Sequence, residues 1–294
     1  SPFPKRLIPE ASAGRRTAPP LVLLGSLRVL AALLLPPAVS SALAGTTLYW
    51  TNETTNNNWS TSAADSNWTD NPGGVAADKR FDTGDTVIFD SAYASGPSPR
   101  TITVAAGGVS MSGMTIQNAG DWLFASNAIG GAGALTMNGR GTATLEKSGT
   151  FTGGTTINSG TLQMGNGGTS GGVTGNILNN GVLVFYRSDS GGNPYVLPNK
   201  ISGSGTLIFK GTGSSNRSAY QGNAANSVFG GRVIVQSGAR LELINSSTGT
   251  GSGITVQNGG GLWLENGSTY SSPIFIVGNG WTEPQGQLGA LRLG

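Results

Sequence analysis

The acidic side chains are the first candidates for chemistry in this chain of 294 residues. Glycoside hydrolysis needs two carboxyl groups about 5 to 10 Å apart. The acids of the second half are sparse and lie in different segments: Glu146, Asp189, Glu242, Glu265 and Glu283. Only Glu242 and Glu265 occupy similar places in successive strand-like segments, where stacking could bring them together. Two lone carboxylates in a ladder are more typical of a solvated face, so we predict no enzymatic activity.

Other kinds of chemistry are limited by residue types that the sequence lacks. There is no cysteine and no histidine, which excludes disulfides, thiol catalysis and Cys-ligated zinc and removes the usual general base. A Gly-x-Ser-x-Gly string surrounds Ser170, but no histidine is present to activate this serine.

A denser group of acids in the first third could hold calcium through oxygen ligands. Its members are Asp65, Asp70, Asp78, Asp82, Asp85 and Asp90. They form no Asp-x-Asp-x-Asp-Gly loop, and the preference of Asp for turns explains them. We therefore predict no cofactor and no dedicated metal site, and the sequence leaves calcium binding open.

Composition and charge narrow the class of protein further. Glycine supplies 49 of the 294 residues, against a usual share of roughly 7%, so the chain must turn often and long helices are not expected. Residues 1–44 hold five basic residues and one acid, which leaves 12 basic and 13 acidic residues from Gly45 onward. The basic character belongs to the first segment, and nucleic-acid binding is not predicted.

Residues 1–44 are predicted to be a signal peptide. Arg15 and Arg16 form a positive start, residues 21–35 are apolar apart from Arg28, and the segment closes on the small-x-small sequence of residues 42–44. The alternative is a membrane anchor, which needs about 20 apolar residues. We therefore expect an exported chain, extracellular or on the bacterial surface, whose mature form begins at Gly45.

Residues 45–99 differ from the rest and are predicted to form an N-terminal β module. Trp50, Trp59 and Trp68 stand nine residues apart among Asn, Thr and Ser. Large aromatic side chains dominate small cores, so we expect a cap that covers the open end of the following domain. The alternative is a sugar-binding face, in which these three tryptophans would contact a glycan.

Residues 100–294 consist of pairs of short β-patterned segments. Their leading isoleucines, separated by 20, 24, 33, 20 and 20 residues, are Ile157, Ile177, Ile201, Ile234, Ile254 and Ile274. Alternating apolar side chains predict strands with one inward face, and coils of this length must stack to bury that face. A propeller or sandwich would instead connect neighbouring strands as hairpins.

The pairs share a turn that favours stacked coils over hairpins. Asn-Gly or Ser-Gly lies inside each pair, as at Ser159-Gly160 and Ser237-Gly238, which is typical of a tight corner between two faces of one coil. The fold class predicted is therefore all-β, a parallel β-helix whose inward isoleucines and leucines form continuous columns.

The segment 139–165 resembles the autotransporter-associated β-strand repeat. The matching residues are Phe151, where the family usually has Tyr, followed by Gly153, Gly154, Ile157, Gly160 and Leu162. A looser second copy supplies Phe229, Gly230, Gly231, Ile234, Gly238 and Leu241. The resemblance implies a right-handed parallel β-helix passenger, exported with the help of an outer-membrane β-barrel translocator that these 294 residues do not contain.

These observations predict a non-enzymatic passenger or stalk segment of an autotransporter-like surface protein, with a role in adhesion. The expected partners are the translocator and a surface glycan or host-cell ligand. Two alternatives stay open at this point, a carbohydrate-binding adhesin and a β-helix enzyme that degrades polysaccharides. We also expect the protein to continue beyond Gly294, because a strand-like segment ends there.

Overall fold

The computed structural model describes residues 45–73, 79–212, 218–222, 229–244, 247–248, 251–265, 267–283, 286–287 and 289–294. The predicted signal peptide, residues 1–44, and Asp78 lie outside this part. The chain divides into two units, Ser1–Ser41 and Ala42–Gly294, and the second unit contains the described residues. Within them no helix is both long and apolar enough to span a membrane.

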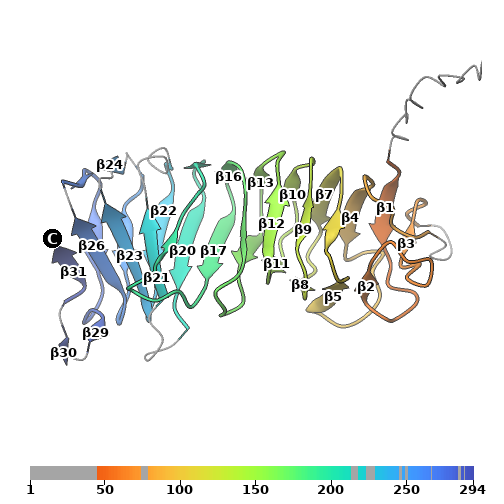
Figure 1. The fold of residues 1–294 in the computed structure, drawn as a ribbon. Helices are drawn as coiled ribbons and strands as arrows, with labels where there is room; N and C mark the ends of the chain where they lie inside the picture. The colour runs from red at the N-terminus through yellow and green to blue at the C-terminus, as the bar shows by residue number, and fades with distance from the viewer. Residues whose placement is uncertain are drawn as a thin grey trace, which may run out of the picture. The chain divides into compact units, whose positions relative to one another are not determined.

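Strands from successive coils line up in long sheets (Figure 1). The first sheet contains β1 (Thr47–Trp50), β3 (Trp68–Thr69), β4 (Thr86–Asp90), β7 (Gly113–Gln117), β10 (Leu135–Met137), β13 (Thr155–Ile157), β16 (Ile177–Asn179) and β19 (Ile201–Ser202). The second sheet contains β2 (Asn58–Trp59), β5 (Arg100–Val104), β8 (Trp122–Ala125), β11 (Thr142–Leu145), β14 (Thr161–Met164), β17 (Val182–Tyr186), β20 (Thr206–Lys210), β22 (Arg232–Val235), β25 (Ile254–Val256) and β28 (Ile274–Ile276).

A third set of strands completes the coils. Its four-stranded sheet contains β6 (Val109–Ser110), β9 (Ile129–Gly131), β12 (Ser148–Phe151) and β15 (Gly172–Val173). Its five-stranded sheet contains β18 (Tyr195–Val196), β21 (Ser218–Gly222), β23 (Ala239–Ile244), β26 (Gly261–Glu265) and β31 (Leu291–Leu293). Two small pairs remain, β24 (Ser247–Thr248) with β27 (Thr269–Tyr270), and β29 (Thr282–Glu283) with β30 (Gly286–Gln287).

The pairing of the strands confirms the predicted solenoid. Apart from β3–β4 and β29–β30, consecutive strands go to different sheets, so a strand inside one of the long parallel sheets pairs with strands of the coils before and after its own. Among the strand pairs of the described residues, only β1–β3 and β29–β30 are antiparallel. A meander of hairpins would show the opposite pattern, and the propeller and sandwich alternatives are therefore excluded.

The core lies inside the coils, where alternate side chains of each strand meet those of the coils next to it. On β17, Leu183 and Phe185 are completely buried. Phe185 and Phe209 on the neighbouring β20 stack with ring centroids 5.6 Å apart and planes 10° from parallel. One coil cannot bury such a face alone, so neighbouring coils complete the core.

Tight corners join the sheets where the sequence predicted them. Gly160 connects β13 to β14 with a φ of 72°, and Gly238 connects β22 to β23 with a φ of 76°. A Cβ on Gly160 would lie 2.3 Å from the backbone oxygen of Gly139, the corner of the preceding coil. Glycine is therefore required here both by backbone conformation and by the close approach of the coils.

The six leading isoleucines do not share one of the interior columns. Ile177 pairs with Ile201 in the first sheet, Ile157 in the same sheet stands opposite Asn179, and Ile254 pairs with Ile274 in the second sheet. Between Ile201 and Ile234 the chain forms two further strands, β20 and β21. Because of these two strands, the later pairs of segments lie in the second and third sets of strands and not in the first and second. The alternation of apolar and polar residues is the same in every sheet, so it does not indicate to which sheet a strand belongs.

Residues 45–99 add strands to the same two sheets. β1 and β4 extend the first sheet in parallel register, and β2 extends the second. β3 lies at the end of the first sheet and pairs antiparallel with β1. The antiparallel strand covers the backbone edge of β1, the role that capping segments have in solenoids.

Candidate functional site

The three spaced tryptophans lie in the core of the N-terminal coils. Trp50, Trp59 and Trp68 are each 0% exposed. Trp68 contacts both of the others edge to face, with centroid distances of 5.0 Å to Trp50 and 5.4 Å to Trp59. A sugar stacks on the open face of a ring, and these rings offer no open face. Their arrangement is that of a packed aromatic core.

The acids Glu242 and Glu265 lie on neighbouring strands but are not paired. Glu242 on β23 stands opposite Trp263 on β26, and Glu265 stands opposite Ile244. Glu242 accepts a hydrogen bond from the guanidinium of Arg240 in a buried ion pair. This carboxylate is therefore held by a cation of its own strand.

The surroundings of Glu242 raise its pKa above the ordinary value. Burial is the largest cause, the charge of Arg240 and its hydrogen bond act in the opposite direction, and the nearby charge of Glu265 raises the pKa further. Glu265 lies two residues beyond Trp263 on β26, so the two carboxylates are diagonal neighbours on adjacent strands. The neighbours of Glu242 are nevertheless a guanidinium and an indole. Arg240 pairs with Glu242, Trp263 stands opposite Glu242 on β26, and the guanidinium carbon of Arg240 lies 3.9 Å from the ring centroid of Trp263.

Replacing Glu242 with glutamine is expected to reduce the pH dependence of stability above pH 4.5. Because the folded-state pKa is raised, this group favours folding below the unfolded-state pKa, and the contribution is lost as the pH rises through the folded-state pKa. Glutamine cannot titrate, so the Tm of Glu242→Gln should fall less between that pH and neutrality. Thermal unfolding followed by circular dichroism measures the difference. Glu146→Gln, at the surface beside Lys147, is the control, and equal slopes in all three proteins would contradict the prediction.

Two buried arginines were missed by the sequence analysis. Arg187 is 5% exposed, forms an ion pair with Asp189 at 2.8 Å and lies 3.9 Å from the ring centroid of Tyr195. Arg240 is 7% exposed and pairs with Glu242. For Arg240 and Glu242 the signal in the sequence is the spacing Arg-x-Glu within a strand, because residues two apart on a strand lie on the same face. Arg187 and Asp189 follow the end of β17, where this rule does not apply.

The described acids of the first third serve as acceptors for nearby donors. Asp65 accepts hydrogen bonds from Asn56, Asn58 and Ser60. Asp85 accepts bonds from two backbone N–H groups, those of residues 46 and 82. Such bonds are typical of turns and of links between coils. Among the described residues, no group of three acids is arranged to hold a metal ion.

Most residues of the repeat motif contribute to the core or to corners. Phe151, Ile157 and Leu162 are 0% exposed, and Gly154 has a φ of 83°. Gly153 lies beside the backbone of the preceding coil, because a Cβ on this residue would be 2.7 Å from the backbone nitrogen of residue 134.

The second copy of the motif has the same arrangement as the first except for the orientation of one side chain, that of Ile234. Phe229 and Leu241 are buried, and Gly230 donates a backbone hydrogen bond to Gly203 of the preceding coil. Gly231 lies against the same coil, because a Cβ there would be 2.0 Å from the oxygen of residue 205. Ile234 was expected in an interior column, but it points outward, since its neighbours on β22, residues 233 and 235, pack in the core.

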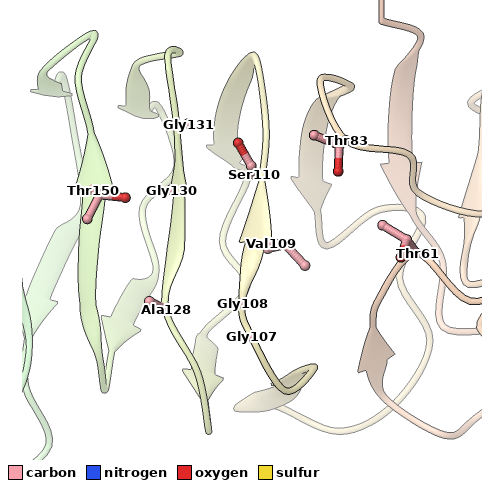
Figure 2. Close-up of a pocket in the computed structure, with 10 residues that line it drawn as sticks. All are labelled: Thr61, Thr83, Gly107, Gly108, Val109, Ser110, Ala128, Gly130, Gly131 and Thr150. Carbon is pink, nitrogen blue, oxygen red and sulfur yellow. The ribbon is translucent and has the colours of Figure 1, made fainter.

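A hollow lies over the third set of strands (Figure 2). It has a volume of about 330 Å³ and is lined by Thr61, Thr83, Gly107, Gly108, Val109, Ser110, Ala128, Gly130, Gly131 and Thr150. Gly130 stands in register between Ser110 and Thr150, and the hydroxyl of Thr150 fills the space above it. The lining has no charged and no aromatic side chain, so it offers hydroxyl groups without a stacking surface.

The outward side of the second sheet presents one row of side chains in continuous register. We call this the outer row: Thr101, Leu123, Thr144, Gln163, Val184, Ile208, Ile234, Thr255 and Phe275. From β17 to β28 the row is apolar except for one threonine. Phe275 is 53% exposed, Thr144, Val184 and Thr255 are buried, and Ile208 and Ile234 are half-buried.

The fold and these surfaces define a parallel β-solenoid protein with long, regular outer faces. Over 56 residues, 19% of the chain, the sequence is 57% identical to the Adhesin BmaC autotransporter of Brucella suis biovar 1 (strain 1330). The matched segment spans only 2% of that relative. No protein-family model and no solved structure matches the chain. The similarity and the solenoid together fit an autotransporter passenger repeat protein, as the repeat motif predicted.

Proposed function

We propose that this chain is a structural passenger segment of an exported bacterial surface protein, and that it takes part in adhesion without catalysing a reaction. The observation that carries the proposal is the ten-stranded second sheet, whose strands continue from coil to coil in unbroken parallel register. The sequence similarity to a protein named as an adhesin autotransporter supports the adhesive role.

The mechanical part of this function follows from the backbone pairing. Each coil donates and accepts hydrogen bonds along the solenoid axis, and each bond contributes about 1 kcal/mol net. Because a coil contacts only its neighbours, stability accumulates coil by coil. Folding that begins at one end and proceeds along the axis would suit export through an outer-membrane translocator, the first partner that we propose.

Exposure at the surface is tested by adding protease to intact cells that produce the whole protein. We expect the solenoid segment to disappear while a cytoplasmic marker stays intact. The solenoid segment is detected with an antibody against residues 45–294, and the cytoplasmic marker is detected with its own antibody. Complete protection of the segment in intact cells, with digestion only after lysis, would refute surface display.

The adhesive role is tested with beads coated with the purified chain. We expect these beads to bind host-cell monolayers or defined members of a glycan array more than albumin-coated beads do. The soluble chain should compete with this binding. Equal binding by both kinds of bead would leave a stalk function without adhesion and would remove this part of the proposal.

The absence of catalysis is tested by incubating the chain with polyuronates and neutral polysaccharides. We expect no cleavage products, because the buried Glu242 is engaged by Arg240 and faces an indole. Turnover that disappears in Glu242→Gln or Glu265→Gln would assign the chain to polysaccharide-degrading enzymes instead.

A further inference from the structure

We propose that the α-amino group of Gly45, set free by cleavage after residue 44, completes the N-terminal cap by forming an ion pair with the buried carboxylate of Asp85. Removal of the predicted signal peptide then builds part of the fold and is not only a step of export. This inference rests on the predicted cleavage site and goes beyond the structural and adhesive role proposed above. It is carried by the contacts of Asp85, the packing of Gly45 and the charges around them.

Asp85 is a buried acid whose two carboxylate oxygens both accept backbone hydrogen bonds. The residue is 7% exposed. One oxygen accepts the N–H of Thr46 and the other accepts the N–H of Asp82, each at 2.8 Å. None of the ion pairs between described residues involves Asp85. Because a buried charge is stabilised by an opposite charge as well as by hydrogen bonds, this carboxylate lacks a cation within the described part of the chain.

Gly45 lies directly against the turn that carries Asp85. A Cβ on Gly45 would be 1.9 Å from the backbone oxygen of Gly84 and 2.9 Å from the Cα of Asp85, so only glycine fits at this position. The next residue, Thr46, accepts a backbone hydrogen bond from Thr86 and donates one to the Asp85 carboxylate. Successive backbone nitrogens can bind one anion together. The nitrogen of Gly45 is therefore placed to become the next donor to the same carboxylate.

A second hollow, beside the start of β1, holds one more acid than cations. It has a volume of about 350 Å³ and is lined by Thr46, Leu48, Asp70, Lys79, Arg80, Asp82 and Asp85. Lys79 forms an ion pair with Asp70 at 3.5 Å, and Arg80 forms one with Asp82 at 3.1 Å. Asp85 is the acid of the lining that remains. An α-amino group is ordinarily protonated at neutral pH, so its positive charge balances the hollow, whereas the peptide N–H that precedes cleavage is uncharged.

An ammonium group suits this place better than a metal ion. Calcium takes about six to eight oxygen ligands, and the described acids include no group of three arranged to hold a metal ion. Both oxygens of Asp85 already face N–H donors, and an ammonium group adds donors of the same kind. We therefore assign this position to the N-terminus of the mature chain.

Mass spectrometry of the exported chain tests where the new amino group lies. We expect the N-terminal peptide of the mature protein to begin at Gly45. A mature chain that begins at another residue overturns the proposal, because its amino group would lie elsewhere. That result would leave the structural and adhesive role untouched, so the two failures are distinguishable.

Hydrogen exchange tests the ion pair in three forms of the mature chain. The first begins with the free amino group of Gly45, the second carries an acetyl group there, and the third retains Ala44. We expect backbone amides of β1 and β4 to exchange about three- to tenfold faster in the second and third forms, because a hydrogen bond between charged groups is lost. Amides of β20, several coils away, should not change. Equal exchange in β1 and β4 of all three forms overturns the proposal.

Two substitutions show whether Asp85 is the partner. In Asp85→Asn the free and the acetylated chains should exchange equally, since the acceptor has no charge. Asp65→Asn is the matched control, because Asp65 is 8% exposed in the same module but accepts its hydrogen bonds from Asn56 and Ser60. There the difference between free and acetylated chains should persist. A difference that persists in Asp85→Asn, or that disappears in Asp65→Asn, overturns the assignment, and the comparison of the three wild-type forms stands even where Asp85→Asn fails to fold.

Discussion

Replacing Trp59 with alanine is expected to lower the free energy of unfolding by about 3 to 5 kcal/mol. The indole is 0% exposed and lies within 5.4 Å, between ring centroids, of Trp68, Phe81 and Phe89. Alanine would leave a large cavity that these rigid rings cannot fill, since Trp68 and Phe89 are held by β3 and β4 of the first sheet. Edge-to-face contacts, each worth about 0.5 to 1.5 kcal/mol beyond burial, would be lost as well.

The loss in Trp59→Ala should be local. Each coil contacts only its neighbours, so backbone hydrogen exchange measured by mass spectrometry should increase first in β1, β2, β4 and β5. Protection of the coils around β20 should change little. Tyr93→Ala is the control, because Tyr93 is 39% exposed and contacts only Tyr49 among the aromatic pairs of the described residues. An increase spread evenly along the chain would mean that the solenoid unfolds as one unit, against this prediction.

Features that depend on neighbouring residues could be predicted from the sequence. The corner at Ser159-Gly160 is an example, because a positive φ and a close approach both require glycine at that place. The inward positions of Leu162 and Phe185 follow from the alternation within one strand. Stacked coils follow in turn, since short strands with one apolar face must find partners.

Features that depend on the position around the coil could not be predicted. The second copy of the motif lies one face further on than the first, because the strands β20 and β21 come between Ile201 and Ile234. As a result Ile234 points outward and becomes part of the outer row. Nothing in the residues of β22 distinguishes this orientation, since the inward Val233 and the outward Ile234 have the same chemical character.

In the candidate site too, some features could be predicted from the sequence and others could not. The approach of Glu242 to Glu265 was predicted from their places in successive pairs, and Glu265 does influence the pKa of Glu242. The ion pair that engages Glu242 was not predicted, although Arg240 lies on the same strand face two residues earlier. Burial of this outward face depends on distant segments: Arg240 donates a hydrogen bond to the backbone oxygen of Gly191, 49 residues earlier. Contacts across that distance are set by how the coils stack.

Replacing Gly160 with valine is expected to cost about 3 kcal/mol of stability and to reduce the yield of folded protein. The φ of 72° is one that a β-branched residue hardly adopts. The new Cβ would also lie 2.3 Å from the backbone oxygen of Gly139 and 2.8 Å from that of Gly141. Neither oxygen can move aside easily, because both belong to the corner of the preceding coil. The two coils would therefore have to separate at this corner.

Gly168→Val is the matched control for Gly160→Val. Gly168 lies in the same region of the chain, but a Cβ there meets nothing within 4 Å and its φ is not positive. Guanidinium denaturation followed by circular dichroism should show a change of less than about 0.5 kcal/mol for this exposed position. Equal stability of the two variants would mean that the corners tolerate side chains, and the glycines of the repeat motif would then need an explanation other than the close stacking of coils.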